Sequence, residues 1–190
     1  MNNPFITDQK FKGIDFSKNR LPKAEYENCI FESCDFSNGY LDNQNFMECE
    51  FIDCNLSNAN LTHTVFNEVS FSHCKMMGLK FEQCNAYLMA FKFNNCMLNF
   101  SSFYQLKLKN THFNECKLIA VDFTAANLAE VFFDACNLEK AVFENSNLEK
   151  ADFTTSFNFT IDPERNRLKK AKFSKENVDG LLSKYDILIK

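Results

Sequence analysis

A large apolar residue occurs at every fifth position over most of the chain. From Phe11 to Phe81 all fifteen positions spaced by five hold such a residue, and from Phe93 to Phe153 all thirteen hold Phe and Leu in alternation. A period of five matches neither the 3.6-residue period of a helix nor the two-residue period of a strand. A five-residue unit cannot bury its apolar residue alone, so the chain must stack many such units.

The residue two places before each large one is small or of medium size. All nine cysteines occupy this position, and Ala or Ser takes it at several other repeats, as in Ala59-Asn60-Leu61. The other three positions are mostly polar, so we expect two of every five residues to face inward. The cysteine spacings do not resemble the C-x₂-C pattern of metal sites, and we interpret the thiols as inert, reduced space fillers.

A second period of twenty residues sets the size of one coil. The same column of the pattern holds only Phe, at Phe11, Phe31, Phe51, Phe71, Phe93, Phe113, Phe133, Phe153 and Phe173. Four five-residue units per coil predict a four-sided stack, in which like side chains pack one coil apart. With the usual strand spacing of about 4.8 Å, eight or nine coils form a rod roughly 40 Å long.

The register slips by two residues between Ala86 and Phe91. Ala86 stands where a large residue is due, and Leu88 is a candidate to fill its place. Two extra residues must bulge outward, which makes Tyr87, Leu88 and Met89 candidates for contact with a partner. The alternative is a tolerated bulge without a role, because surface loops accept insertions at low cost.

The pattern resembles that of the pentapeptide-repeat family: a small residue, Asp or Asn, Leu or Phe, and two variable residues. The resemblance covers the chain from about Gln9 to Phe173. It implies an all-β solenoid, a right-handed quadrilateral β-helix with a solid interior, over residues 1–173.

Residues 174–190 are expected to cap the rod. An amphipathic pattern predicts a short helix over 174–184, with Ser174 as its N-cap, and the last six residues read as a strand. The layout is similar to that of the Qnr-type quinolone-resistance proteins, in which such a segment joins two rods end to end. The expected cap or dimer contacts are Val178, Leu181, Leu182, Ile187, Leu188 and Ile189.

Charge is distributed unevenly along the chain. No Lys or Arg occurs over 24–74, which holds nine acidic residues, most of them expected on two adjacent faces. The Qnr-type resemblance implies an acidic, DNA-like dimer that binds DNA gyrase or topoisomerase IV and protects it from quinolones or toxins. The candidate binding residues are Glu25, Glu27, Glu32, Glu48, Glu50, Asp53 and Glu68. One alternative is a solvated face that keeps the rod soluble, and another is a scaffolding rod with no topoisomerase role.

Other function classes fit the sequence poorly. Four glycines leave little room for phosphate-binding loops, and the net charge of −4 argues against direct binding of nucleic acid or a membrane surface. The three histidines are predicted at outward positions without a catalytic partner, so we expect neither enzymatic activity nor a cofactor or metal. The sequence shows no secretory signal and no apolar span, so a cytoplasmic protein is expected.

Overall fold

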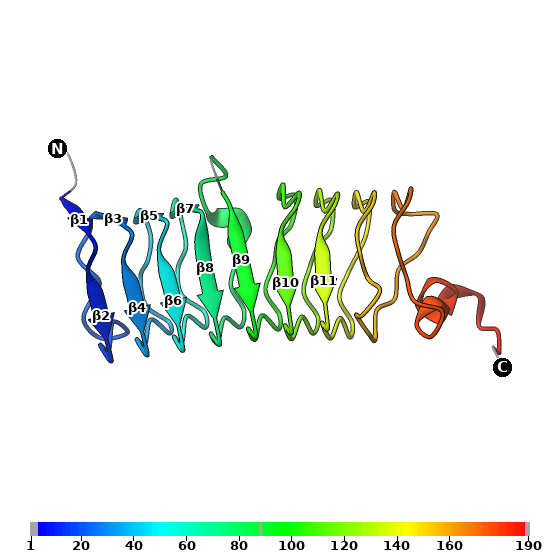
Figure 1. Cartoon of the computed structure of the whole chain (residues 1–190), viewed down its shortest axis with the longest axis horizontal. Helices are drawn as coiled ribbons and strands as arrows, with labels where there is room; N and C mark the ends of the chain where they lie inside the picture. Colours follow the sequence, from blue (N-terminus) through cyan, green and yellow to red (C-terminus); the bar gives the residue numbers. More distant parts are fainter. Residues whose placement is uncertain (1–3, 88, 189–190) are drawn as a thin grey trace.

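The structure is a computed structural model that describes residues 4–87 and 89–188. The chain winds into a rod with its first residues at one end and its last residues at the other (Figure 1). Successive coils are parallel and in register, offset by 20 residues, except for the 22 residues between β8 and β9. The predicted fold class, an all-β quadrilateral solenoid, is confirmed.

Two of the four sides carry regular parallel sheets. The four-strand face contains β1 (Phe5–Thr7), β3 (Glu25–Glu27), β5 (Asn45–Met47) and β7 (Val65–Asn67). The seven-strand face contains β2 (Lys10–Lys12), β4 (Ile30–Glu32), β6 (Glu50–Ile52), β8 (Val69–Ser72), β9 (Phe91–Asn94), β10 (His112–Asn114) and β11 (Phe132–Asp134). The other sides pair through single-residue bridges such as Tyr40 with Asn60.

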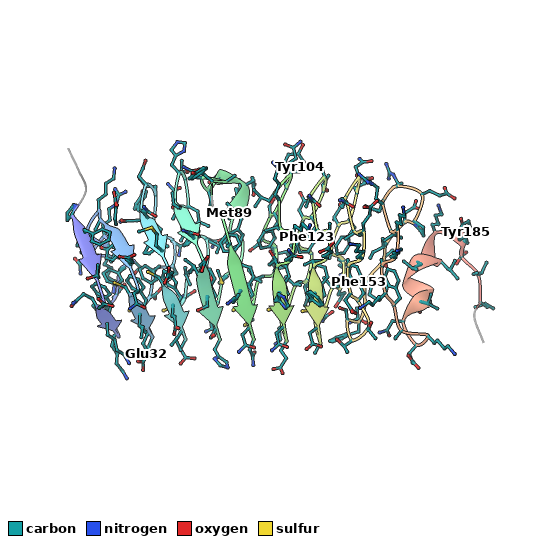
Figure 2. The ribbon with its side chains drawn as sticks, turned by 45° about the horizontal axis from the view of Figure 1, so that its top comes forward. Glu32, Met89, Tyr104, Phe123, Phe153 and Tyr185 are labelled. Atoms are coloured by element: carbon teal, nitrogen blue, oxygen red, sulfur yellow. The ribbon has the colours of Figure 1, made fainter. Side chains whose placement is uncertain are left out.

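Aromatic columns fill the interior. The nine phenylalanines from Phe11 to Phe173 stack face to face, with ring centroids 4.8–5.5 Å apart. A second column, Phe81 to Phe143, meets the first edge to face, an arrangement that suits the ring quadrupole. Figure 2 shows Phe123 and Phe153 inside the rod, with Glu32 and Tyr104 at its surface.

The corners of the coil use left-handed backbone at residues other than glycine. The residue two places after most of the large ones has a positive φ, for example 55° at Asn58 and 56° at Ala125. Its N–H donates to a carbonyl one coil onward, as from Ala125 to Glu144 at 2.7 Å. The polar residue just before the large one braces the same turn, since Asn60 Oδ1 accepts a hydrogen bond from the Thr62 N–H at 3.0 Å. This bracing explains the preference for Asp and Asn at that position.

The cysteines pack as the sequence predicts. All nine are buried and none forms a disulfide. The thiols of Cys54 and Cys74 donate to carbonyls of the previous coil at 3.2 and 3.3 Å, and the Ser146 hydroxyl does the same at 2.9 Å. Burial raises the pKa of Cys49 to about 12, which keeps this thiol protonated and unreactive at neutral pH.

The two-residue slip interrupts one face and leaves its neighbour intact. The four-strand sheet ends at β7, whereas the seven-strand sheet continues from β8 to β9. After the short 3₁₀ helix η1 (Phe81–Gln83), the chain rises above the line of the other coils before β9 (Figure 1). Phe91 is buried against the rings of Phe66, Phe71, Phe81 and Phe93, so this residue fills the interior at the coil with the slip.

The C-terminal segment differs from the prediction. Two 3₁₀ helices, η2 (Val178–Leu181) and η3 (Ser183–Tyr185), replace the helix expected over 174–184, and residues 185–188 form no strand. Ser174 caps no helix, since its buried hydroxyl makes no hydrogen bond within the described residues. The short segment contains Gly180, which favours helix poorly and whose carbonyl accepts a hydrogen bond from Ile161 at 3.0 Å.

Candidate partner-binding site

The predicted acidic residues lie on two adjacent sides of the rod and along the corners. Glu25 and Glu27 belong to β3 on the four-strand face, while Glu32 and Glu50 belong to β4 and β6 on the seven-strand face. Glu48 and Glu68 occupy the corner between these faces, one coil apart. Asp53 lies at the following corner.

Glu32 differs from the other six residues because it is neutralised locally. Its carboxylate oxygens lie 2.5 Å from Lys10 Nζ and 2.6 Å from Lys12 Nζ. Hydrogen bonds from these lysines lower the pKa of Glu32 to about 2. The free acidic surface therefore consists of Glu25, Glu27, Glu48, Glu50, Asp53 and Glu68, none of which pairs with a basic side chain within residues 4–87 and 89–188.

The Glu32 ion pairs predict a specific pH dependence. Because the folded pKa lies below the ordinary 4.5, the pairs stabilise the fold above pH 4.5, and this contribution is lost as the pH falls toward 2. A carbon-13 NMR titration of the Glu32 carboxyl is expected to show a midpoint near 2. Replacing Lys12 with methionine should move the midpoint upward, and a midpoint near 4.5 in the unchanged protein would contradict the pairing.

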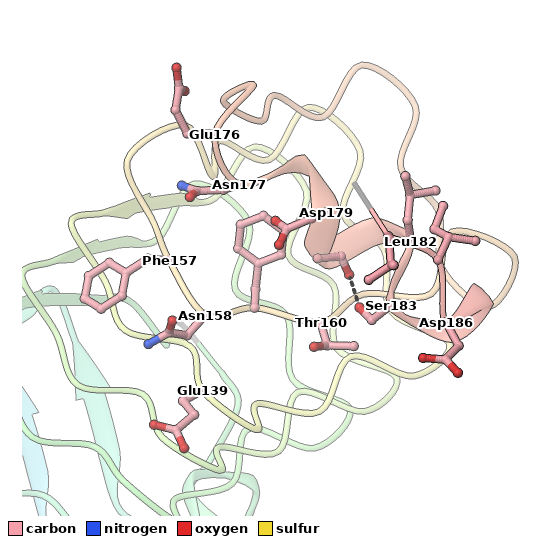
Figure 3. A pocket seen from close by; sticks show the side chains of 14 residues that line it. Glu139, Phe157, Asn158, Thr160, Glu176, Asn177, Asp179, Leu182, Ser183 and Asp186 are labelled. Carbon is pink, nitrogen blue, oxygen red and sulfur yellow. Dashed lines mark hydrogen bonds between the residues drawn. The ribbon is translucent and has the colours of Figure 1, made fainter. Parts of the chain in front are cut away.

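A large hollow lies at the C-terminal end of the rod (Figure 3). It has a volume of about 800 Å³ and is lined by Phe157, Phe159, Leu182, Ile187 and Leu188, among others. The Ser183 hydroxyl donates to the Gly180 carbonyl at 3.0 Å and ties η3 to η2. The structure therefore brings together three of the predicted cap residues.

The other cap candidates lie differently. Leu181 is half-buried against the core, and Val178 is exposed, whereas Ile189 lies outside the described residues. At the bulge, Tyr87 is 73% exposed and Met89 packs partly against the core. Leu88 also lies outside the described residues. Sequence reasoning missed exposed aromatic residues on other sides of the rod, among them Tyr40, Phe100 and Tyr104.

The described residues contain no group of three His, Cys, Asp or Glu side chains placed to hold a metal ion. Within the same residues, no helix has the length and apolar character needed to cross a bilayer. His63 and His73 occupy exposed corners, and His112 stacks on Phe132 with ring centroids 4.4 Å apart.

Two family models match the repeats. A model for the pentapeptide repeat region matches residues 86–158, and a model for eight copies of the pentapeptide repeat matches residues 45–83. Together these matches span more than half of the chain. The chain belongs to the pentapeptide-repeat family.

Solved structures show the same fold. Two trypsin-treated variants of QnrB1, a plasmid-mediated fluoroquinolone resistance protein, match with TM-scores of 0.64 and 0.66 at 19% identity. The first match covers 97% of this chain and 99% of QnrB1, and the second covers 100% and 92%. HetL from the cyanobacterium Nostoc, which is involved in heterocyst differentiation regulation, matches with a TM-score of 0.48 at 15% identity, covering 91% and 88%. A comparison with curated protein sequences gave no significant match.

Proposed function

We propose that this chain is a non-enzymatic, cytoplasmic interaction protein that binds DNA gyrase or topoisomerase IV through its acidic surface. In this proposal the rod occupies the site of DNA on the enzyme and so protects it from quinolones or toxins. The fold shared with a fluoroquinolone resistance protein supports the class of protein. The charge density of the acidic surface supports the kind of partner.

The charge density is the observation that carries the proposal. Six unpaired acids, from Glu25 to Glu68, lie on three successive coils, which span roughly 10–15 Å at a strand spacing of about 4.8 Å. This is about one negative charge per 2 Å, close to the one per 1.7 Å along double-stranded DNA. A groove that binds DNA through Lys and Arg side chains would meet a similar field on this rod.

We further propose that two copies join end to end through the C-terminal hollow. Leu182, Ile187 and Leu188 would meet the same residues of a second copy in an isologous contact. Ile187 and Leu188 are exposed, and pairing would remove both side chains from water. The contact would double the length of the acidic rod.

A supercoiling assay tests the proposal. The protein would be titrated into bacterial gyrase with relaxed plasmid, with and without ciprofloxacin. We expect restored supercoiling under the drug or direct inhibition without it, weakening steeply as salt screens the charges. In the double variant Glu48→Lys with Glu68→Lys, the effective concentration should rise at least about tenfold, since two reversed contacts cost 1.4 kcal/mol or more.

A matched control separates position from net charge. The double variant Asp122→Lys with Glu144→Lys makes the same charge change away from the acidic surface, and it should act like the unchanged protein. Equal loss in both double variants, or no effect of the unchanged protein on either enzyme, would contradict the proposal.

The exposed aromatic residues favour one alternative, a scaffolding rod that binds another protein. Phe100 is 63% exposed and Tyr104 is 41% exposed, and aromatic side chains are common anchors at protein interfaces. A scaffold of this kind predicts no topoisomerase binding at all. It also predicts that Phe100→Ala weakens capture of the true partner, whereas Glu48→Lys does not.

A further inference from the structure

Two aromatic rings stack on the outer surface of the seven-strand face. His112 in β10 and Phe132 in β11 are register partners, and their ring centroids lie 4.4 Å apart at an interplanar angle of 15°. This separation is close to one strand spacing of about 4.8 Å, so the two rings are stacked along the axis of the rod. Phe132 is 40% exposed, which leaves part of its ring open to a ligand.

The stack ends at Phe132 because the next residue of the same column is short. Asp152 is bridged to Phe132 one coil onward, and Lys172 is bridged to Asp152 in the coil after that. A carboxylate does not extend as far from the sheet as an aromatic ring. The face of Phe132 that is turned away from His112 therefore has no third ring beside it.

A hollow of about 360 Å³ lies beside this ring, on the side of Asp152. The two stacked rings form part of its lining, and the polar residues that line it are Asp134, Asp152, Thr154 and Thr155. The hollow thus combines a flat apolar wall with a few oxygen-bearing side chains, as sites for small ligands commonly do. We call this hollow the Phe132 slot.

Hydrogen bonds hold the oxygens of the Phe132 slot in place. Thr155 Oγ1 donates to Asp134 Oδ1 at 2.6 Å, and Thr154 Oγ1 donates to Asp152 Oδ1 at 2.6 Å. Lys172 Nζ donates to Asp152 Oδ2 at 3.0 Å. Asp134 Oδ2 has no hydrogen-bond donor or basic side chain beside it within residues 4–87 and 89–188, so this oxygen is free to accept.

The balance of charge in the slot favours a positive group. Asp134 and Asp152 are two acids, and Lys172 is the one base that pairs with either of them among the described residues. The Lys172 side chain is 64% exposed, and an exposed ion pair of this kind contributes little to stability. A ligand with several donors can therefore share Asp152 with Lys172 or take its place.

We propose that the Phe132 slot binds the guanidinium group of an arginine side chain from a partner protein. A guanidinium is planar, positively charged and weakly hydrated, and it stacks on aromatic faces. Stacked on Phe132, it would lie at the level of the coil that holds Asp152 and Thr154. Its five N–H donors point outward in one plane, where carboxylate oxygens accept them in pairs. A lysine ammonium has the charge but neither the plane nor the fork of donors.

The Phe132 slot lies on the same side of the rod as Glu50 of the acidic surface. β6, which holds Glu50, and β11, which holds Phe132, are four strands apart in the seven-strand sheet, or about 19 Å. A partner that binds the acidic surface through basic side chains could therefore reach the slot as well. Arginine binding is measured with no topoisomerase present, so its failure and the failure of the proposed function are distinguishable.

An NMR titration of the full chain tests the slot. The probe is N-acetyl-L-arginine amide, and the aromatic ¹H–¹³C signals of His112 and Phe132 report its binding. We expect saturable shifts with a dissociation constant in the millimolar range, as befits a single side chain. The citrulline analogue keeps the plane but lacks the charge, and it should bind about tenfold more weakly. The lysine analogue should bind a few-fold more weakly than arginine.

Two variants remove the slot's parts one at a time. Phe132→Ala removes the wall and should abolish the saturable shift of the His112 signals. Asp134→Asn keeps the shape, removes one charge and should raise the dissociation constant about threefold to fivefold. The matched controls Phe100→Ala and Asp122→Asn change an aromatic and an acidic residue on other sides of the rod. Both should bind arginine like the unchanged protein.

Several results would overturn the proposal. These are shifts that stay linear without saturation, equal affinity for the arginine and citrulline analogues, and unchanged binding by a folded Phe132→Ala variant. Tighter binding of a neutral sugar such as methyl glucoside would also overturn it, because the slot would then be a polyol site. Should Phe132→Ala fail to fold by circular dichroism, Asp134→Asn and the citrulline comparison decide the matter.

Discussion

Replacing Phe113 with alanine is expected to lower the free energy of unfolding by about 3–5 kcal/mol. The ring is fully buried and stacks between Phe93 and Phe133 at 5.0 and 5.1 Å. It also meets Phe103 and Phe123 edge to face. The rigid coils above and below hold the cavity open, so the loss should fall in the upper part of this range. Urea unfolding followed by circular dichroism measures it.

Phe100→Ala provides the matched control, because the same ring is removed from a corner where it is 63% exposed. Its effect should stay within about 0.5 kcal/mol. A loss below about 1 kcal/mol for Phe113→Ala would show that the column relaxes around the gap. An unchanged m-value in both variants would show that the rod still unfolds as one unit.

Replacing Ala125 with proline should destabilise the rod by at least about 3 kcal/mol. Ala125 has a φ of 56°, whereas the proline ring holds φ near −65°. Proline also lacks the N–H that Ala125 donates to Glu144 at 2.7 Å. The corner therefore loses both its conformation and its bond to the next coil, and the same urea experiment records the change.

Ala125→Gly should act in the opposite direction. The left-handed conformation costs alanine about 1–2 kcal/mol and glycine almost nothing, while glycine loses about 0.5–1 kcal/mol more chain entropy on folding. A net gain of about 0.5–1 kcal/mol is expected. If glycine instead destabilised the corner, the Ala125 side chain would be contributing packing that outweighs the backbone strain.

The period of five, the coil of twenty and the buried columns were all readable from the sequence. The sequence places the phenylalanines from Phe11 to Phe173 and the cysteines at fixed positions of the repeat. In a stacked coil each repeat position is either buried or exposed, and it is the same in every coil. The left-handed corners were not predicted, because sequence reasoning links positive φ to glycine and this chain has only four glycines. Their signal was present in the Asp and Asn residues that often precede a large one, such as Asn60, whose side chain braces the turn.

The C-terminal cap was predicted less well. Val178, Leu181 and Leu182 have helical spacing, but packing against the last coil and the Ile161 hydrogen bond to Gly180 decide the local backbone. At the acidic surface, the grouping of acids on adjacent faces followed from the four-sided coil. The neutralisation of Glu32 depends on Lys10 and Lys12, one coil away. A count of charged residues over 24–74 does not include these two lysines, so the sequence analysis missed the ion pairs.

The two-residue register slip between η1 and β9 leaves every later residue on the side of the rod that the twenty-residue period assigns to it. Because four units of five complete a circuit, an insertion of five residues would turn all downstream sides by a quarter revolution, and only multiples of twenty would leave them in place. Between η1 and β9 the chain rises out of line with the other coils (Figure 1), and Phe93 still lies on Phe71 at 5.5 Å. Related rods can therefore become longer during evolution by adding whole coils of twenty residues. Shorter insertions are tolerated where the extra residues lie outside the stacked coils.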